Sequence, residues 1–156
     1  MFGDGTRAAC KAISEADLAR FMADCVLDVD NRYTDRVLPI GGPGGALTAK
    51  AQAEILFKAA NLEPKLFGVP VGLMDGLIRI FDFVASVYPK AEDTAEFAKI
   101  GRYYATESML VMDPDTGLYT ADGTPEYGTD TLAEFFQKAV KDGGLEGQEL
   151  GDQAVF

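Results

Sequence analysis

The sequence predicts a single helix-rich α/β domain that spans residues 1–156. Apolar residues recur at helical spacing in several segments, short apolar runs stand between these segments, and clusters of Gly and Pro mark the turns. A hydrophobic content of 47% with 25% charged residues is typical of a globular protein. A length of 156 residues fits one domain.

The first part of the chain predicts a loop, a helix and a short strand. Residues 1–10 are rich in Gly and form the loop. Ser14 is the expected N-cap of the first helix, because acidic residues follow it in the first turn. The helix should bury one apolar stripe, formed by Leu18, Phe21, Met22, Cys25 and Val26. Residues 28–35 form a polar turn, and residues 36–40 form a short edge strand that contains a proline.

A Gly-rich turn then leads to the second helix. The run Gly-Gly-Pro-Gly-Gly at 41–45 resembles a phosphate-binding loop, but its spacing fits neither the Walker motif nor the dinucleotide motif. A tight turn between strand and helix explains it better. Thr48 is the expected N-cap of a helix over residues 49–60. Residues 65–69 predict a second short strand, followed by Pro70 in the first turn of the next helix.

The third predicted helix begins at Val71 and ends near Tyr88, and it is apolar over most of its circumference. Its polar residues fall on one narrow stripe, which we expect to face water and to be joined by charge pairs within the helix: Asp75, Arg79, Asp82 and Ser86. Such a helix should be buried on most sides. Four alternatives for the surface that covers it stay open: the rest of its own chain, a partner protein, a missing half of the protein, or a membrane surface.

The last third of the chain predicts a helix over 91–105, a hairpin and a final helix. The hairpin pairs residues 109–112 with 118–120 around the turn at 113–117. Asp113 and Asp115 resemble a calcium loop, but Pro114 and the missing Glu at the twelfth position favour a hairpin turn. Thr129 and Asp130 are expected to cap a helix over 131–141, which ends at Gly143 and Gly144. We expect Val155 and Phe156 to dock in an apolar groove.

Composition excludes several classes of function. The net charge of −11 argues against a nucleic-acid partner, because phosphate binding needs clustered Lys and Arg. The chain has no His, which rules out His-dependent catalytic triads and zinc sites within it, and we expect no metal site. Its two cysteines do not form a disulfide scaffold, and Cys25 is expected in the core. We expect no transit peptide within these residues and no membrane-spanning segment.

Several motifs carry a resemblance to a known family. They are Lys-Ile-Gly-Arg-Tyr-Tyr-Ala-Thr-Glu-Ser-Met-Leu-Val at 99–111 and Gly-Gln-Glu-Leu-Gly-Asp-Gln-Ala-Val-Phe at 147–156, with support from residues 1–5, 36–48 and 125–132. Together they resemble the C-terminal part of the chloroplast divinyl chlorophyllide 8-vinyl reductases, in the atypical short-chain dehydrogenase/reductase superfamily. The resemblance implies a chloroplast location and a Rossmann-type enzyme that reduces an 8-vinyl group with NADPH during chlorophyll synthesis.

The family's nucleotide-binding half is absent from these residues. The chain has no Gly-x-Gly-x-x-Gly motif and no tyrosine followed four residues later by lysine. We therefore assign no catalytic residue, and we expect no cofactor to be bound by this chain alone. The implied role is the substrate side of the reductase. Apolar walls and a carboxylate anchor for a tetrapyrrole would come from Phe67, Met74, Arg102, Tyr103 and Tyr104.

Other interpretations stay open at this point. Each of these five residues is equally well explained as part of the core. The chain as a whole would also suit a non-catalytic subunit of a chloroplast photosynthetic membrane complex, derived from such a reductase, or a reductase-like accessory subunit of another complex. In either case we expect the helix between Val71 and Tyr88 to contact the missing half, other subunits or a membrane surface.

Overall fold

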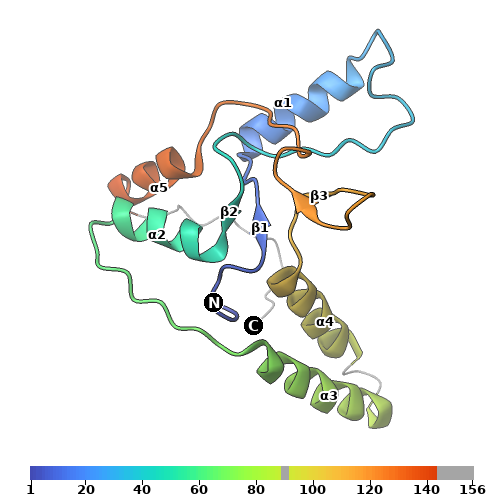
Figure 1. Ribbon diagram of the computed structural model, residues 1–156, viewed down its shortest axis with the longest axis vertical. Helices are drawn as coiled ribbons and strands as arrows, with labels where there is room; N and C mark the ends of the chain where they lie inside the picture. Colours follow the sequence, from blue (N-terminus) through green and yellow to red (C-terminus); the bar gives the residue numbers. More distant parts are fainter. Residues whose placement is uncertain (89–91, 144–156) are drawn as a thin grey trace.

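The computed structural model describes residues 1–88 and 92–143, and it has a helix-rich α/β architecture (Figure 1). Two small antiparallel sheets, β1–β2 and β3–β4, lie among the helices. Ala9 pairs with Thr48 in the first sheet, and Val111 pairs with Thr120 in the second. The elements are β1 (Ala9–Cys10), α1 (Glu15–Val26), β2 (Leu47–Thr48), α2 (Ala49–Ala59), α3 (Val71–Val87), α4 (Glu92–Thr106), β3 (Val111–Met112), β4 (Tyr119–Thr120) and α5 (Leu132–Lys141). The predicted helix-rich α/β class is confirmed.

Local capping explains where three of the helices begin. The Ser14 hydroxyl accepts the N–H of Asp17, and the Thr48 hydroxyl accepts the N–H of Ala51. Thr131 and Glu134 form a reciprocal capping box at the start of α5. The predicted caps Ser14 and Thr48 are confirmed, whereas the cap of the last helix is Thr131 rather than the two residues before it. Pro70, predicted in the first turn of the third helix, is instead the N-cap residue that precedes α3.

Two predicted strands, at 36–40 and 65–69, are wrong. Residues 36–40 make no bridge to another described segment, although the next residue, Gly41, bridges to Glu126; residues 65–69 contribute a single bridge, from Val69 to Phe2. A strand needs a partner of matching length, and each of these segments meets one short stretch of chain. The N-terminal loop also differs from the prediction, because its last residues form β1. The hairpin around 113–117 is confirmed, with β3 shorter than predicted.

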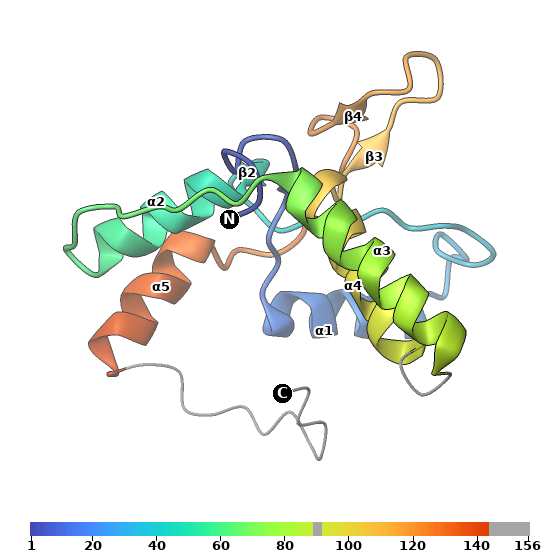
Figure 2. The same ribbon diagram turned by 90° about the horizontal axis from the view of Figure 1, so that it is seen from below.

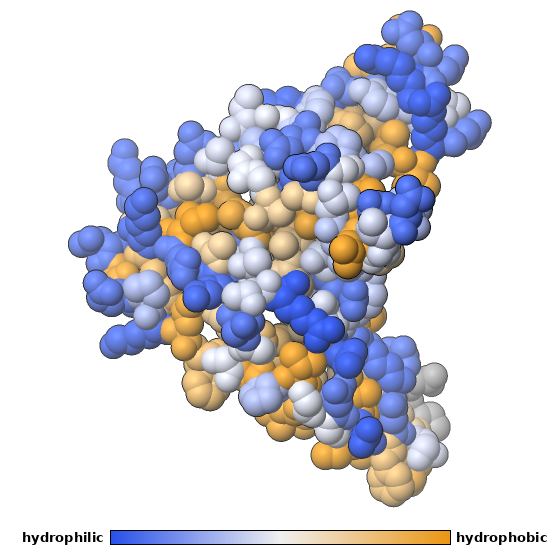
Figure 3. Space-filling view, in the orientation of Figure 1, coloured by the Kyte–Doolittle hydropathy of each residue, from blue (hydrophilic) through white to orange (hydrophobic). Residues whose placement is uncertain are grey.

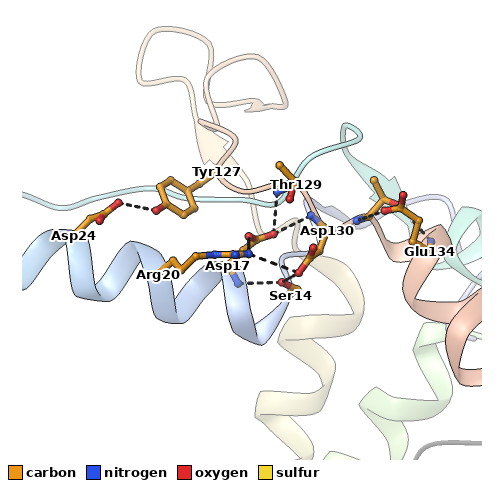
Figure 4. A network of polar contacts seen from close by, with 9 residues as sticks. Ser14, Asp17, Arg20, Asp24, Tyr127, Thr129, Asp130 and Glu134 are labelled. Carbon is orange, nitrogen blue, oxygen red and sulfur yellow. Dashed lines mark hydrogen bonds and ion pairs between the residues drawn. The ribbon is translucent and has the colours of Figure 1, made fainter.

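Polar contacts join α1 to the segment that precedes α5 (Figure 4). The Asp17 carboxylate is fully buried and accepts the N–H groups of Thr129 and Asp130 as well as a hydrogen bond from Arg20. The Asp130 N–H lowers the pKa of Asp17 most, and Arg20 and the Thr129 N–H lower it further. The carboxylate therefore acts as a structural link between segments more than 100 residues apart in sequence.

Four of the described helices, all except α1, form two pairs that stand apart from each other (Figures 1 and 2). Helix α2 packs against α5, and α3 packs against α4 in an antiparallel hairpin that projects from the rest of the molecule. We call this hairpin the α3–α4 arm. At its base, the Ser108 hydroxyl accepts the Ala9 N–H, and the Gly3 N–H donates to the Val69 carbonyl.

Little of the described chain is buried. Ala95 is the one apolar residue classed as buried among the described residues, and the protein exposes 11,639 Å². A compact protein of 16.7 kDa would expose roughly 7,600 Å². The predicted burial of the α1 stripe is wrong for most of its residues, since Met22 and Val26 are 61% and 85% exposed. Cys25 is half-buried rather than in a core.

Helix α3 also differs from the expectation that it would be buried on most sides. None of its residues is buried, and several large apolar side chains face outwards: Leu73, Leu77, Ile80, Phe83, Val84 and Val87. Figure 3 shows apolar side chains at the surface of the α3–α4 arm. Across the described ranges, no helix has the length and hydropathy needed to cross a membrane. The predicted docking of Val155 and Phe156 falls outside the described residues.

A candidate ligand cavity in the α3–α4 arm

A cavity of about 590 Å³ lies between α3 and α4. This volume is within the range of small-molecule binding sites. The cavity walls combine charged groups of both signs with one aliphatic and one aromatic side chain. The lining residues are Asp75, Ile78, Arg79, Lys99, Arg102, Tyr103, Thr106 and Glu107.

Ion pairs between the two helices hold the walls of this cavity together. Arg102 of α4 bonds to Asp75 of α3, and the Lys99 ammonium lies 2.8 Å from the Asp82 carboxylate. Lys99 also bonds to Glu96 at 2.9 Å, and its pKa is raised above the ordinary value, first by Asp82 and then by Glu96. The antiparallel hairpin brings opposite charges together along its length.

The predicted charge pairs within α3 are therefore wrong. Asp75 and Asp82 turn to cations on α4 instead of pairing with Arg79, and so the polar stripe lines the interface between the helices rather than facing water alone. The physical reason is that α4 presents cations opposite each acid, and an isolated helix gains only a few tenths of a kcal/mol from such pairs.

The end of the cavity contacts the β3–β4 hairpin. The Tyr119 hydroxyl donates to Glu107 at 2.9 Å, and this bond together with burial raises the pKa of Tyr119. Thr106 is buried, and its hydroxyl donates to the Arg102 carbonyl at 3.0 Å. These contacts fix the last turn of α4, where the cavity side chains Arg102 and Tyr103 originate.

The structure gathers part of the predicted substrate-binding set. Arg102 and Tyr103 line the cavity. Met74 is half-buried near Gly101 of α4, at the interface between the helices. Tyr104 packs edge-on against Tyr103, with ring centroids 5.9 Å apart, but does not line the cavity. Phe67 lies outside the cavity, 79% exposed, in the segment before α3.

The sequence reading missed Arg79 as a residue of this site. Within the described part of the chain, Arg79 makes no hydrogen bond or ion pair, although every other charged residue that lines the cavity does. Its position on the polar stripe between Asp75 and Asp82 was the available signal. That signal indicated pairing of Arg79 with acids of its own helix. A local sequence pattern does not show that cations of α4 lie opposite these acids.

The Gly-rich turn at 41–45 serves the fold, as predicted. Gly42 packs so closely on the Ala12 carbonyl that a Cβ there would overlap it, and Gly44 has a φ of 97°. The Glu126 carboxylate bonds to Lys11 at 3.0 Å, and Lys11 lowers the pKa of Glu126 most, with smaller contributions from the N–H groups of Gly45 and Gly44. An internal carboxylate thus takes the place that an anionic ligand would need.

The described residues contain no group of three or more His, Cys, Asp or Glu side chains that could hold a metal ion. The site is thus a cavity with ion-paired, aliphatic and aromatic walls, in which Arg79 has no hydrogen-bond or ion-pair partner among residues 1–88 and 92–143. Its chemistry suits binding and orientation of a ligand. The described residues form a helix-rich α/β region with a candidate ligand cavity, and the sequence contains no Gly-x-Gly-x-x-Gly motif.

Comparisons with known proteins give this region a family context. No family model matches the chain. It is 57% identical over 156 residues to the chloroplastic divinyl chlorophyllide a 8-vinyl-reductase of Cucumis sativus, 54% identical over 156 residues to that of Zea mays, and 56% identical over 153 residues to that of Arabidopsis thaliana. The alignments cover 98–100% of this chain and 36–38% of the relatives.

The chain is therefore similar, from end to end, to about a third of the divinyl chlorophyllide a 8-vinyl-reductases. The predicted resemblance to a C-terminal part of this chloroplast enzyme is confirmed.

Proposed function

We propose that the chain is the substrate-side part of a divinyl chlorophyllide 8-vinyl reductase and acts in chlorophyll biosynthesis in the chloroplast. The observation that carries this proposal is the identity of 54–57% along the chain to four reductases of that name, all of them chloroplastic. The cavity of the α3–α4 arm supports it through its size, which is within the range of small-molecule sites.

In this proposal, residues 1–156 form one unit, and NADPH binds to the remainder of the enzyme. That remainder would carry the Rossmann-type sheet and the Gly-rich nucleotide loop that this sequence lacks. The role of the present chain is to bind the tetrapyrrole and to orient its vinyl group towards the nicotinamide. Three of the five predicted substrate residues fit this role by their position. Arg102 and Tyr103 line the cavity, and Met74 lies at the interface between α3 and α4.

We further propose that the remainder of the enzyme docks on the outward apolar face of α3. Gly72 and Gly76 lie one helical turn apart, and no atom lies within 4 Å of a Cβ built on either. Two such glycines allow a second backbone to approach closely. Four large apolar side chains of α3 are each more than half exposed and leave an apolar face for such a contact: Leu73, Ile80, Phe83 and Val87.

Two-piece complementation tests this function. The 156-residue chain would be co-expressed with the part of the Cucumis sativus reductase that lies outside the matched region. We expect the purified pair to add two hydrogens to the 8-vinyl group in the presence of NADPH, and either piece alone to be inactive. A pair that co-purifies but leaves divinyl chlorophyllide unchanged under conditions where the intact relative is active would contradict the proposal.

A non-catalytic role in a chloroplast membrane complex is the second candidate. The observation that favours it is the amount of apolar surface on α1 and α3. In that case the chain would co-sediment with thylakoid membranes or a membrane complex and would bind no tetrapyrrole. Tetrapyrrole binding without sedimentation favours the reductase.

A further inference from the structure

Arg79, on the wall of the α3–α4 cavity, is a cation that forms no hydrogen bond or ion pair with any residue that the structure describes. The cavity lining contains three cations, Arg79, Lys99 and Arg102, and two carboxylates, Asp75 and Glu107. Asp82 and Glu96 pair with Lys99 at the edge of the lining, and Asp75 pairs with Arg102. Arg79 is therefore the cation of the lining that no carboxylate of the described residues neutralises, and it favours an anionic group of a ligand at that place.

The other charged groups of the lining are already engaged. Arg102 bonds to Asp75, Lys99 bridges Asp82 and Glu96, and Glu107 accepts the Tyr119 hydroxyl. A ligand carboxylate that approached Arg102 or Lys99 would have to compete with these pairs. Arg79 is the guanidinium of the lining that offers its donors without breaking an existing bond, and a guanidinium binds a carboxylate through two parallel hydrogen bonds.

The neighbours of Arg79 indicate what the rest of the ligand is like. Ile78 of α3 and Tyr103 of α4 contribute an aliphatic and an aromatic surface to the same cavity. Aromatic side chains pack well against flat conjugated ligands. We propose that Arg79 binds the free carboxylate of a large conjugated ligand whose ring lies against Tyr103 and Ile78. This inference rests on the proposed function, in which the ligand is a chlorophyllide. The carboxylate that Arg79 binds is then the propionate of the chlorophyllide.

A pair of ligands that differ in one group tests this role. Chlorophyllide a and its propionate methyl ester would be titrated, by tetrapyrrole fluorescence, into the 156-residue chain and into the complemented pair. The variants are Arg79→Gln and Arg79→Lys. Arg36→Gln is the matched control, because Arg36 is an exposed arginine outside the cavity lining.

We expect Arg79→Gln to weaken binding of the free acid by about tenfold or more, because a charge-assisted bidentate contact is lost. Binding of the methyl ester should change little, and Arg79→Lys should restore part of the affinity for the acid. Equal losses for acid and ester, an unchanged affinity for the acid, or no binding of chlorophyllide by chain and pair alike would overturn the assignment.

The outcome separates this inference from the proposed function. A complemented pair that reduces the vinyl group with the same KM in wild type and Arg79→Gln would refute the role of Arg79 and leave the reductase intact. Binding of the acid through Arg79 without reduction by any pair would refute the reductase function and leave the carboxylate site intact.

Discussion

The carboxyl group of Asp17 lies directly against the backbone of Gly128, in the space that a side chain at Gly128 would need. Gly128 has a φ of 88°, and the next two residues donate their N–H groups to the same carboxylate. The start of α1 and the chain that leads into α5 are thus fitted to each other at one point (Figure 4).

Replacing Gly128 with alanine should destabilise the fold. The new Cβ would overlap the Asp17 carboxyl group, and an L residue is strained at this φ. We expect a loss of about 1–3 kcal/mol or more in the free energy of unfolding, measured by urea denaturation. Gly44→Ala is the matched control, because Gly44 also has a positive φ but open space around it. Equal losses in both variants would show that backbone strain, not the Asp17 contact, sets the effect.

Asp17→Asn should lower the melting temperature by several degrees. The amide lacks the charge that pairs with Arg20 and accepts the two backbone N–H groups less well. Asp30→Asn is the control, because the Asp30 side chain is 72% exposed. A melting temperature for Asp17→Asn equal to that of the control would contradict this role for the carboxylate.

The pKa of Asp17 determines how the stability contributed by this carboxylate changes with pH. The folded-state pKa lies below the ordinary value of 3.8, so the stabilisation from this carboxylate is complete above that value and is lost as pH falls through the folded-state pKa. We expect wild type to lose its advantage over Asp17→Asn in this acidic range, measured by thermal melts at a series of pH values. A difference that stays constant down to the most acidic pH would argue against the linkage.

Substitutions at Gly76 separate the stability of α3 from its role as an interface. Gly76→Ala should stabilise the chain by about 0.5–1 kcal/mol, because glycine is unfavourable inside a helix and the site has open space. Gly76→Leu should leave the chain folded but weaken its association with the remainder of the reductase, measured by co-purification. Undiminished association of the leucine variant would place the interface elsewhere.

The isolated chain should not bind NADPH measurably in a calorimetric titration. It has no Gly-x-Gly-x-x-Gly turn, and its own Gly-rich turn contacts the Glu126 carboxylate. Micromolar, stoichiometric binding would contradict this prediction. Glu126→Gln provides a control, because it tests whether removal of the internal anion alone opens an anion site at that turn.

Local sequence signals predicted the helices well and the tertiary contacts poorly. Ser14 and Thr48 cap their helices through hydrogen bonds to residues three positions away, which a local pattern contains. The segment at 36–40 fails as a strand because its pairing depends on residues near 126, far along the chain. Arg79 was expected to pair with Asp75 and Asp82, but cations on α4 take both acids.

Burial was the least predictable property. The stripe of α1 has the periodicity of a buried face, and yet Val26 is 85% exposed. Periodicity shows that a face is apolar, but it does not show which surface covers that face. The apolar faces of α1 and α3 are consistent with a chain that spans about a third of its relatives' length.

A chimeric enzyme tests the central proposal most directly. The matched region of the Cucumis sativus reductase, 36% of its length, would be replaced by this 156-residue chain, and the conversion of divinyl to monovinyl chlorophyllide with NADPH would be followed by mass spectrometry. We predict that the chimera gains two hydrogens per substrate at a rate within about tenfold of the intact relative, a loss of no more than about 1.4 kcal/mol of transition-state stabilisation. A chimera that folds and binds NADPH but leaves the vinyl group unreduced would contradict it.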